Sequence, residues 1–174
     1  MTISGVYAEI LATLQPLGLL RAETPATLQE KCGELAEEAE FLEEWASNRR
    51  GTLTMVAACF DPNALQNPAE RTKAVAAWQP PLWKDQGWRG SYEPASRRVR
   101  IEREGRLLAD EPAIHACHAA VAWNKAFADQ GLEVLIIDLG TDDESFLAVS
   151  KPAADRIRGE NLLVAARPCP FPKK

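Results

Sequence analysis

The chain has 174 residues, of which 46% are hydrophobic and 26% are charged, and its formal net charge is −5 at pH 7. This composition is typical of a globular protein and excludes an intrinsically disordered chain. No apolar run approaches the roughly 20 residues of a membrane-spanning helix. The N-terminal MTISGVYAEI lacks the basic start and long apolar stretch of a secretory signal. We therefore expect a cytoplasmic protein with no membrane contact, folded as a single globular domain over residues 1–174.

The first half of the chain contains mostly helical patterns. Val6, Ile10 and Leu14 recur at four-residue spacing, as on one face of a helix. Thr24 and Pro25 form a helix start, with a capping hydroxyl followed by a proline in the first turn. In chain order we predict helices at 3–15 and 25–48, a strand in the apolar run 52–60, a short helix at 68–77 and a long irregular loop at 78–96.

The second half alternates strands and helices. Charged and apolar residues alternate in RVRIERE, which favours a strand over 97–104 that turns at Glu104-Gly105. Asp110 followed by Pro112 indicates the start of a long helix. The elements that we predict from there are a helix at 111–129, strands at 132–139 and 145–150, a helix at 152–159 and a strand at 162–167.

Together these elements predict an α+β fold. Five or six strands would form one mostly antiparallel sheet. The two long helices, at 25–48 and 111–129, would pack on one face of that sheet. Residues 1–50 would form a helical N-terminal part, and residues 51–174 the part that contains the sheet.

Charge is distributed unevenly along the chain. Residues 1–50 carry nine acidic and four basic side chains, whereas residues 71–106 carry nine basic and four acidic ones. Because the chain as a whole is acidic and the basic segment is local, this pattern argues against a nucleic-acid-binding protein. The basic segment could instead meet the acidic helix within the same molecule.

The two histidines, His115 and His118, lie three residues apart in the predicted helix at 111–129. This spacing places both imidazoles on one side of a helix, where they could share a metal ion with Glu111 one turn earlier. A catalytic zinc site needs a third firm ligand, and the HExxH pattern is absent. The alternative is that one histidine lies at the surface and the other forms a hydrogen bond near the core.

Four carboxylates occur close together before the second strand of the C-terminal pair, namely those of Asp138, Asp142, Asp143 and Glu144. Such a group could bind Mg²⁺ or Ca²⁺, or act as a paired acid and base. A solvated hairpin turn explains the same residues. So does an acidic recognition surface for a basic partner.

Aromatic residues gather in the predicted loop at 78–96, where Trp83 and Trp88 lie beside Arg89 and Tyr92. Tryptophan, tyrosine and arginine dominate the energetics of protein interfaces, so this loop is a candidate surface for binding a partner. The alternative is that the indole rings complete the edge of a core, because tryptophan buries a large area.

The C-terminal pattern resembles a signature of small uncharacterised bacterial α+β proteins, some of which are regarded as immunity partners of secreted toxins. The residues that carry the resemblance run from a strand into Asp138-Leu139-Gly140-Thr141-Asp142-Asp143 and then into a strand through Phe146 and Val149. The resemblance implies a protein that occludes a bacterial toxin. It carries over no residue roles.

Two classes of function remain open. The first is a non-enzymatic protein-binding module. Its contact surface would be the acidic helix (Glu37, Glu40 and Glu44), the acidic turn or the tryptophan loop. The second is a metal-dependent enzyme that uses His115 and His118 or the carboxylates of residues 138–144. A homodimer that buries the tryptophan loop is a further option. The chain has no nucleotide-binding or hydrolase motif and its four cysteines form no CxxC pair, so we expect no cofactor.

Overall fold

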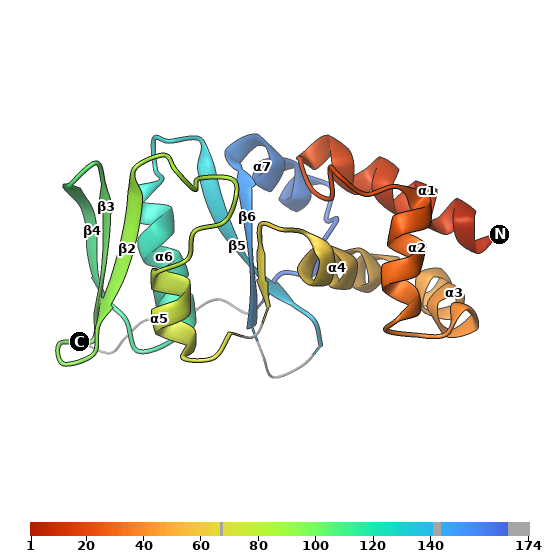
Figure 1. The fold of residues 1–174 in the computed structure, drawn as a ribbon, viewed down its shortest axis with the longest axis horizontal. Helices are drawn as coiled ribbons and strands as arrows, with labels where there is room; N and C mark the ends of the chain where they lie inside the picture. The colour runs from red at the N-terminus through yellow and green to blue at the C-terminus, as the bar shows by residue number, and fades with distance from the viewer. Residues whose placement is uncertain (67, 141–143, 167–174) are drawn as a thin grey trace.

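The computed structural model describes residues 1–66, 68–140 and 144–166, which form an α+β fold (Figure 1). The helical elements are α1 (Ile3–Leu14), the 3₁₀ turn η1 (Gln15–Leu17), α2 (Pro25–Gly33), α3 (Glu38–Ser47), α4 (Arg49–Phe60), α5 (Arg71–Ala76), α6 (Ala116–Ala126) and α7 (Lys151–Gly159). The strands are β1 (Ala64–Gln66), β2 (Trp88–Glu93), β3 (Arg98–Arg103), β4 (Arg106–Pro112), β5 (Leu132–Asp138) and β6 (Glu144–Ser150). Each helix in these ranges is too short or too polar to span a lipid bilayer.

The strands form two antiparallel sheets of three strands each, so the prediction of one sheet with five or six strands is wrong. The first sheet has the order β1-β6-β5 and the second has the order β2-β3-β4. Helix α6 lies between the two sheets (Figure 1). A helix that is apolar around most of its circumference must be covered on more than one side. Its buried residues include Ala116, Ala119, Ala120, Ala122, Trp123 and Ala126.

The sheet β1-β6-β5 is buried on both faces. Along β6, Leu147 and Val149 belong to a core shared with α1, α4 and α7, whereas Phe146 and Ala148 belong to a second core around α6. This alternation follows from the two-residue period of a strand. The sheet therefore separates the N-terminal helices from α5, α6 and the second sheet, as Figure 1 shows.

The two long helices of the prediction are also wrong. The helix predicted at 25–48 is divided into α2 and α3, and the break follows Gly33, a residue type that weakens helices. The second predicted long helix begins only at Ala116. The residues before it pair with β3 as strand β4, and Asp110 Oδ1 accepts a hydrogen bond from Arg98 Nε at 2.7 Å instead of capping a helix.

Further differences concern short segments. The apolar run at 52–60 belongs to helix α4 and not to a strand. The segment predicted as a loop contains strand β2. In the described part of 162–167 a single bridge, from Ala165 to Ile137, replaces the predicted strand. The structure confirms the other predicted elements with small shifts at their ends, namely those at 3–15, 68–77, 97–104, 132–139, 145–150 and 152–159.

Candidate functional sites

The tryptophans of the predicted loop lie in the core around α6. Trp83 is 0% exposed and Trp88 is 5% exposed. The ring of Phe127 lies 4.9 Å from that of Trp83 and 4.8 Å from that of Trp88, measured between centroids. A partner that approached this segment would meet the exposed Arg89 and the partly buried Tyr92, because both indoles are covered in this arrangement.

The two histidines lie at the start of α6, with ring centroids 5.5 Å apart. His118 is buried, and its Nδ1 accepts the backbone N–H groups of Ile114 and His115, both at 3.1 Å. His118, the third residue of α6, therefore accepts N–H groups of the residues just before the helix, as in a capping box. His115 is exposed. Glu111 forms an ion pair with Lys125 at 2.7 Å.

A third metal ligand does not join this pair within the residues that the structure describes, where no group of three or more His, Cys, Asp and Glu side chains is arranged to hold an ion. The acidic turn is only partly described. Asp138 Oδ1 accepts the backbone N–H of Gly140 at 2.7 Å, and Asp138 stands opposite Glu144 in the sheet. Asp142 and Asp143 lie outside the described residues, so their predicted role stays a prediction.

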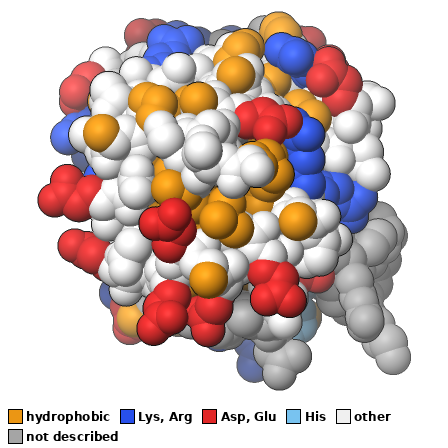
Figure 2. All heavy atoms as spheres, turned by 90° about the vertical axis from the view of Figure 1, so that its right-hand side faces the viewer, with side chains coloured by type: hydrophobic (Ala, Val, Ile, Leu, Met, Phe, Trp, Pro, Cys, Tyr) orange, Lys and Arg blue, Asp and Glu red, His pale blue; other side chains and the backbone are white. Residues whose placement is uncertain are grey.

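Helices α2 and α3 and the connection between them form a surface rich in carboxylates, which we call the acidic surface. Leu35, at the centre of this segment, is 56% exposed. Figure 2 faces this end of the molecule and shows carboxylates around apolar side chains. The members of the acidic surface are all exposed, and they are Glu30, Glu34, Glu37, Glu38, Glu40, Glu43 and Glu44.

The carboxylates of the acidic surface form no ion pair with any other described residue. Glu44 Oε1 accepts a hydrogen bond from Asn48 Nδ2 at 2.7 Å. Several carboxylates elsewhere are paired with cations, as Glu9 is with Arg49 at 2.6 Å and Asp110 is with Arg98. The acidic surface is thus a concentration of negative charge without ion pairs to the part of the chain that the structure describes.

The basic segment at 71–106 does not meet the acidic helices. Most of its cations lie on or beside the sheet β2-β3-β4, at the opposite end of the molecule from α2 and α3 (Figure 1). On that sheet Arg89 stands opposite Glu102, and Asp110 lies within 2.7 Å of Arg98 and 3.4 Å of Arg100. The carboxylates of Glu102 and Asp110 therefore face cations on the neighbouring strands of this sheet.

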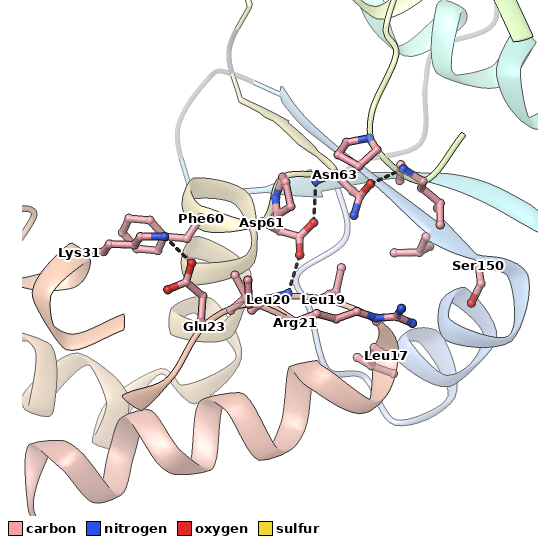
Figure 3. Close-up of a pocket in the computed structure, with 17 residues that line it drawn as sticks. Leu17, Leu19, Leu20, Arg21, Glu23, Lys31, Phe60, Asp61, Asn63 and Ser150 are labelled. Carbon is pink, nitrogen blue, oxygen red and sulfur yellow. Dashed lines mark hydrogen bonds and ion pairs between the residues drawn. The ribbon is translucent and has the colours of Figure 1, made fainter. Parts of the chain in front are cut away.

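A cleft opens where the N-terminal helices meet the first sheet, and we call it the junction cleft (Figure 3). Its volume is about 570 Å³, and its walls come from residues 17–23, 60–63, 81–82 and 148–150 together with Lys31. Asp61, which is 6% exposed, is the centre of one wall. Its Oδ2 accepts the N–H of Leu20 at 2.6 Å, and its Oδ1 accepts the N–H of Asn63 at 2.7 Å.

Asn63 extends this network to the second half of the chain. Its side-chain oxygen accepts the N–H of Leu82 at 2.8 Å, and its backbone oxygen accepts the N–H of Ala148 at 2.9 Å. Burial raises the pKa of the Asp61 carboxyl, and the hydrogen bonds from Leu20 and Asn63 partly oppose that rise. Asp61 and Asn63 therefore hold segments that are far apart in the sequence at one place.

Sequence reasoning identified the acidic helix but missed the junction cleft. In the sequence, Asp61-Pro62-Asn63 indicates a turn that ends the preceding apolar element, because these residue types are common in turns. The burial of Asp61 is what would indicate the cleft, and the sequence Asp61-Pro62-Asn63 does not reveal whether the aspartate is buried.

No family model, curated protein or solved structure matches the chain. The resemblance to small bacterial α+β proteins therefore remains a prediction.

Proposed function

We propose that this chain is a non-enzymatic protein-binding module whose acidic surface binds a basic surface of another protein. The single observation that supports this function is the set of exposed carboxylates on α2, α3 and their connection, which have no cation partner among the described residues. Opposite charges across an interface speed association and select against wrong partners.

The exposed Leu35 gives the acidic surface an apolar centre. Tight interfaces need such a centre, because charged residues at the rim contribute mainly to the rate of association. Charged and apolar groups are thus arranged here as in a protein interface, with Leu35 between the two helices that carry the carboxylates. A toxin of the kind that the resemblance implies would be one such partner, and its occlusion would then be the activity of the chain.

A capture experiment with matched variants tests this proposal. The first variant, Glu37→Gln/Glu40→Gln/Glu44→Gln, removes three charges from the acidic surface. The control, Glu93→Gln/Glu104→Gln/Asp129→Asn, removes three exposed charges elsewhere, so the two variants have the same net charge.

Cell extract from the source organism is passed over the wild-type chain and both variants, and the retained proteins are quantified by mass spectrometry. The proposal predicts a basic protein that the wild type and the control retain and the first variant loses. With that protein purified, calorimetry should show an affinity about tenfold weaker for the first variant and a fall in affinity with added salt.

Equal retention of every protein by the two variants would contradict the proposal. So would an affinity of the purified partner that does not depend on salt, because the contact would then not rely on the carboxylates. If the partner is a toxin, its activity should fall on addition of the wild-type chain and fall less on addition of the first variant.

A further inference from the structure

The junction cleft has the size and the composition of a ligand site. Binding clefts for small molecules typically have volumes of about 300–1,000 Å³ and combine apolar walls with a few polar groups. The cleft of about 570 Å³ has apolar walls that include Leu17, Leu19, Phe60, Pro81 and Leu82. Its polar side chains come from segments that are far apart in the sequence, as Arg21, Asp61 and Ser150 do (Figure 3).

The cleft is held open by bonds that do not need a ligand. Asp61 and Asn63 accept the N–H groups of Leu20, Asn63 and Leu82, so the backbone on both sides of the cleft is fixed. These bonds use the carboxylate of Asp61 and the amide oxygen of Asn63. The side-chain amide of Asn63 also forms a hydrogen bond with the Asp61 carboxylate, which opposes the rise in the pKa of that group.

Arg21 supplies the cation of the cleft. Its guanidinium lies against Gly18, only 3.3 Å from the place that a Cβ would occupy, and it extends toward Ser150 (Figure 3). Gly18 has a φ of +83°, a conformation that side chains other than glycine rarely adopt. Arg21 forms no ion pair with any of the residues described, whereas the other cation of the cleft, Lys31, is bound to Glu23.

The charges that face the cleft define the ligand that it accepts. The Lys31 ammonium holds the pKa of Glu23 below its usual range, so this pair is internally neutral. Arg21 then remains as the cation for an anionic group. Asp61 lines the same cleft, where its carboxylate accepts the N–H of Leu20, and a carboxylate there repels a second negative charge. A single anionic group is therefore favoured over a doubly charged one.

Ser150 is the remaining polar group near Arg21. Its hydroxyl oxygen accepts the N–H of Ala153 at 3.3 Å, which caps helix α7 and leaves the hydroxyl proton available to donate. Guanidinium and hydroxyl donors together match the acceptors of a carboxylate.

We propose that the junction cleft binds a small amphipathic carboxylate, with the carboxylate on Arg21 and Ser150 and the apolar body against the leucine and proline walls. This proposal does not rest on the protein-binding function, because the acidic surface contributes none of the groups that contact the ligand.

The test is an NMR titration of the ¹⁵N-labelled full chain with three probes of similar shape. The probes are 3-phenylpropanoate, its neutral amide, and phenyl phosphate, which is largely doubly charged at pH 7.5. The carboxylate should shift the amide signals of Leu19, Leu20 and Leu82 with a Kd of about 1 mM or below. The neutral amide and phenyl phosphate should each bind about tenfold more weakly.

Two variants complete the test. Arg21→Gln should weaken binding of the carboxylate about tenfold, because the charged donor is lost. Arg106→Gln, which removes an exposed cation far from the cleft, should leave binding unchanged. Arg21 is exposed, so the variant should fold, and its spectrum without ligand shows whether it does.

Three results would overturn the proposal. One is the absence of shifts with the carboxylate up to about 10 mM, well above the expected Kd. Another is equal affinity for the carboxylate and its neutral amide. The third is binding that Arg21→Gln and Arg106→Gln affect equally, because the cation of the cleft would then have no specific role.

Discussion

Replacement of Asp61 by alanine tests whether one buried carboxylate joins the N-terminal helices to the rest of the chain. Asp61 accepts the N–H of Leu20, which lies 41 residues away in the sequence, at 2.6 Å. It also accepts the N–H of Asn63 at 2.7 Å. Leu20 has a φ of +52°, which is unusual for a residue other than glycine, so this bond also stabilises a strained backbone.

The magnitude follows from the two donors that lose their acceptor. An unsatisfied buried donor costs about 1–3 kcal/mol, and the partly buried Asn63 N–H loses less than the buried Leu20 N–H, so Asp61→Ala should lower the free energy of unfolding by about 1–4 kcal/mol. That is a large fraction of the total stability of a typical domain, which is about 5–15 kcal/mol. Urea unfolding followed by circular dichroism measures the change.

The matched control is Asp129→Ala, which removes an exposed carboxylate that forms no side-chain hydrogen bond or ion pair with any described residue and should change stability by less than about 0.5 kcal/mol. If Asp61→Ala has as small an effect as the control, the two hydrogen bonds do not hold the cleft together. The reasoning about the walls of the junction cleft would then be refuted.

The remaining predictions concern the pH dependence of stability and the core around α6. Because the pKa of Asp61 is raised in the folded state, the folded chain binds this proton more tightly than the unfolded chain does. The free energy of unfolding of the wild type, minus that of Asp61→Asn, should therefore fall as pH rises from about 4 through the raised pKa. A flat or rising difference in urea titrations at several pH values would show that burial does not control this group. Gly90→Ala would place a Cβ 1.8 Å from the carbonyl oxygen of Ala76 and should destabilise the chain by about 3 kcal/mol or more, whereas Gly159→Ala, which has no neighbour within 4 Å, should change stability by less than about 1 kcal/mol. Trp123→Phe removes the donor to a buried backbone carbonyl, a bond of 2.8 Å, and should lower the free energy of unfolding by about 1–3 kcal/mol in the same urea assay. An unchanged urea midpoint would contradict this prediction.

Local patterns in the sequence predict the elements that have one clear period or a clear cap. Strands β5 and β6 are apolar runs of strand length on either side of a turn, and both lie where the pattern places them. The apolar run at 52–60 has no such period. A short apolar run of this kind fits a buried strand and a buried helix equally well. The helix is formed because α4 packs between α1 and α3 on one side and the first sheet on the other.

The arrangement of the sheets could not be predicted, because it depends on whether α6 packs against one sheet or between two sheets. Nothing local distinguishes a helix that lies on one sheet from a helix that lies between two. Trp88 is a comparable example, since a tryptophan in a segment with prolines reads as a loop, yet it pairs with Arg103 in a strand and packs on Phe127.

The two candidate sites also differ in how much of each can be predicted from local sequence. The carboxylates of the acidic surface are close in the sequence, so they lie near one another even though the predicted helix at 25–48 is divided into α2 and α3. The junction cleft combines Arg21, Asp61, Leu82 and Ser150, which lie in four separate segments. Only the tertiary fold brings such residues together, and no local motif marks them.

The position of unpaired charge, rather than the net charge of −5, is the stronger argument for where a protein partner binds. On the sheet β2-β3-β4, a basic partner that approached Asp110 would have to compete with Arg98 and Arg100. On the acidic surface a basic partner displaces only water, since Glu37 and Glu40 have no cation to give up among the described residues. Removing water from a charge costs free energy at either surface. Binding at the surface where no existing ion pair is broken therefore has the more favourable free energy. A basic partner should therefore prefer α2 and α3 to the charged outer face of the second sheet.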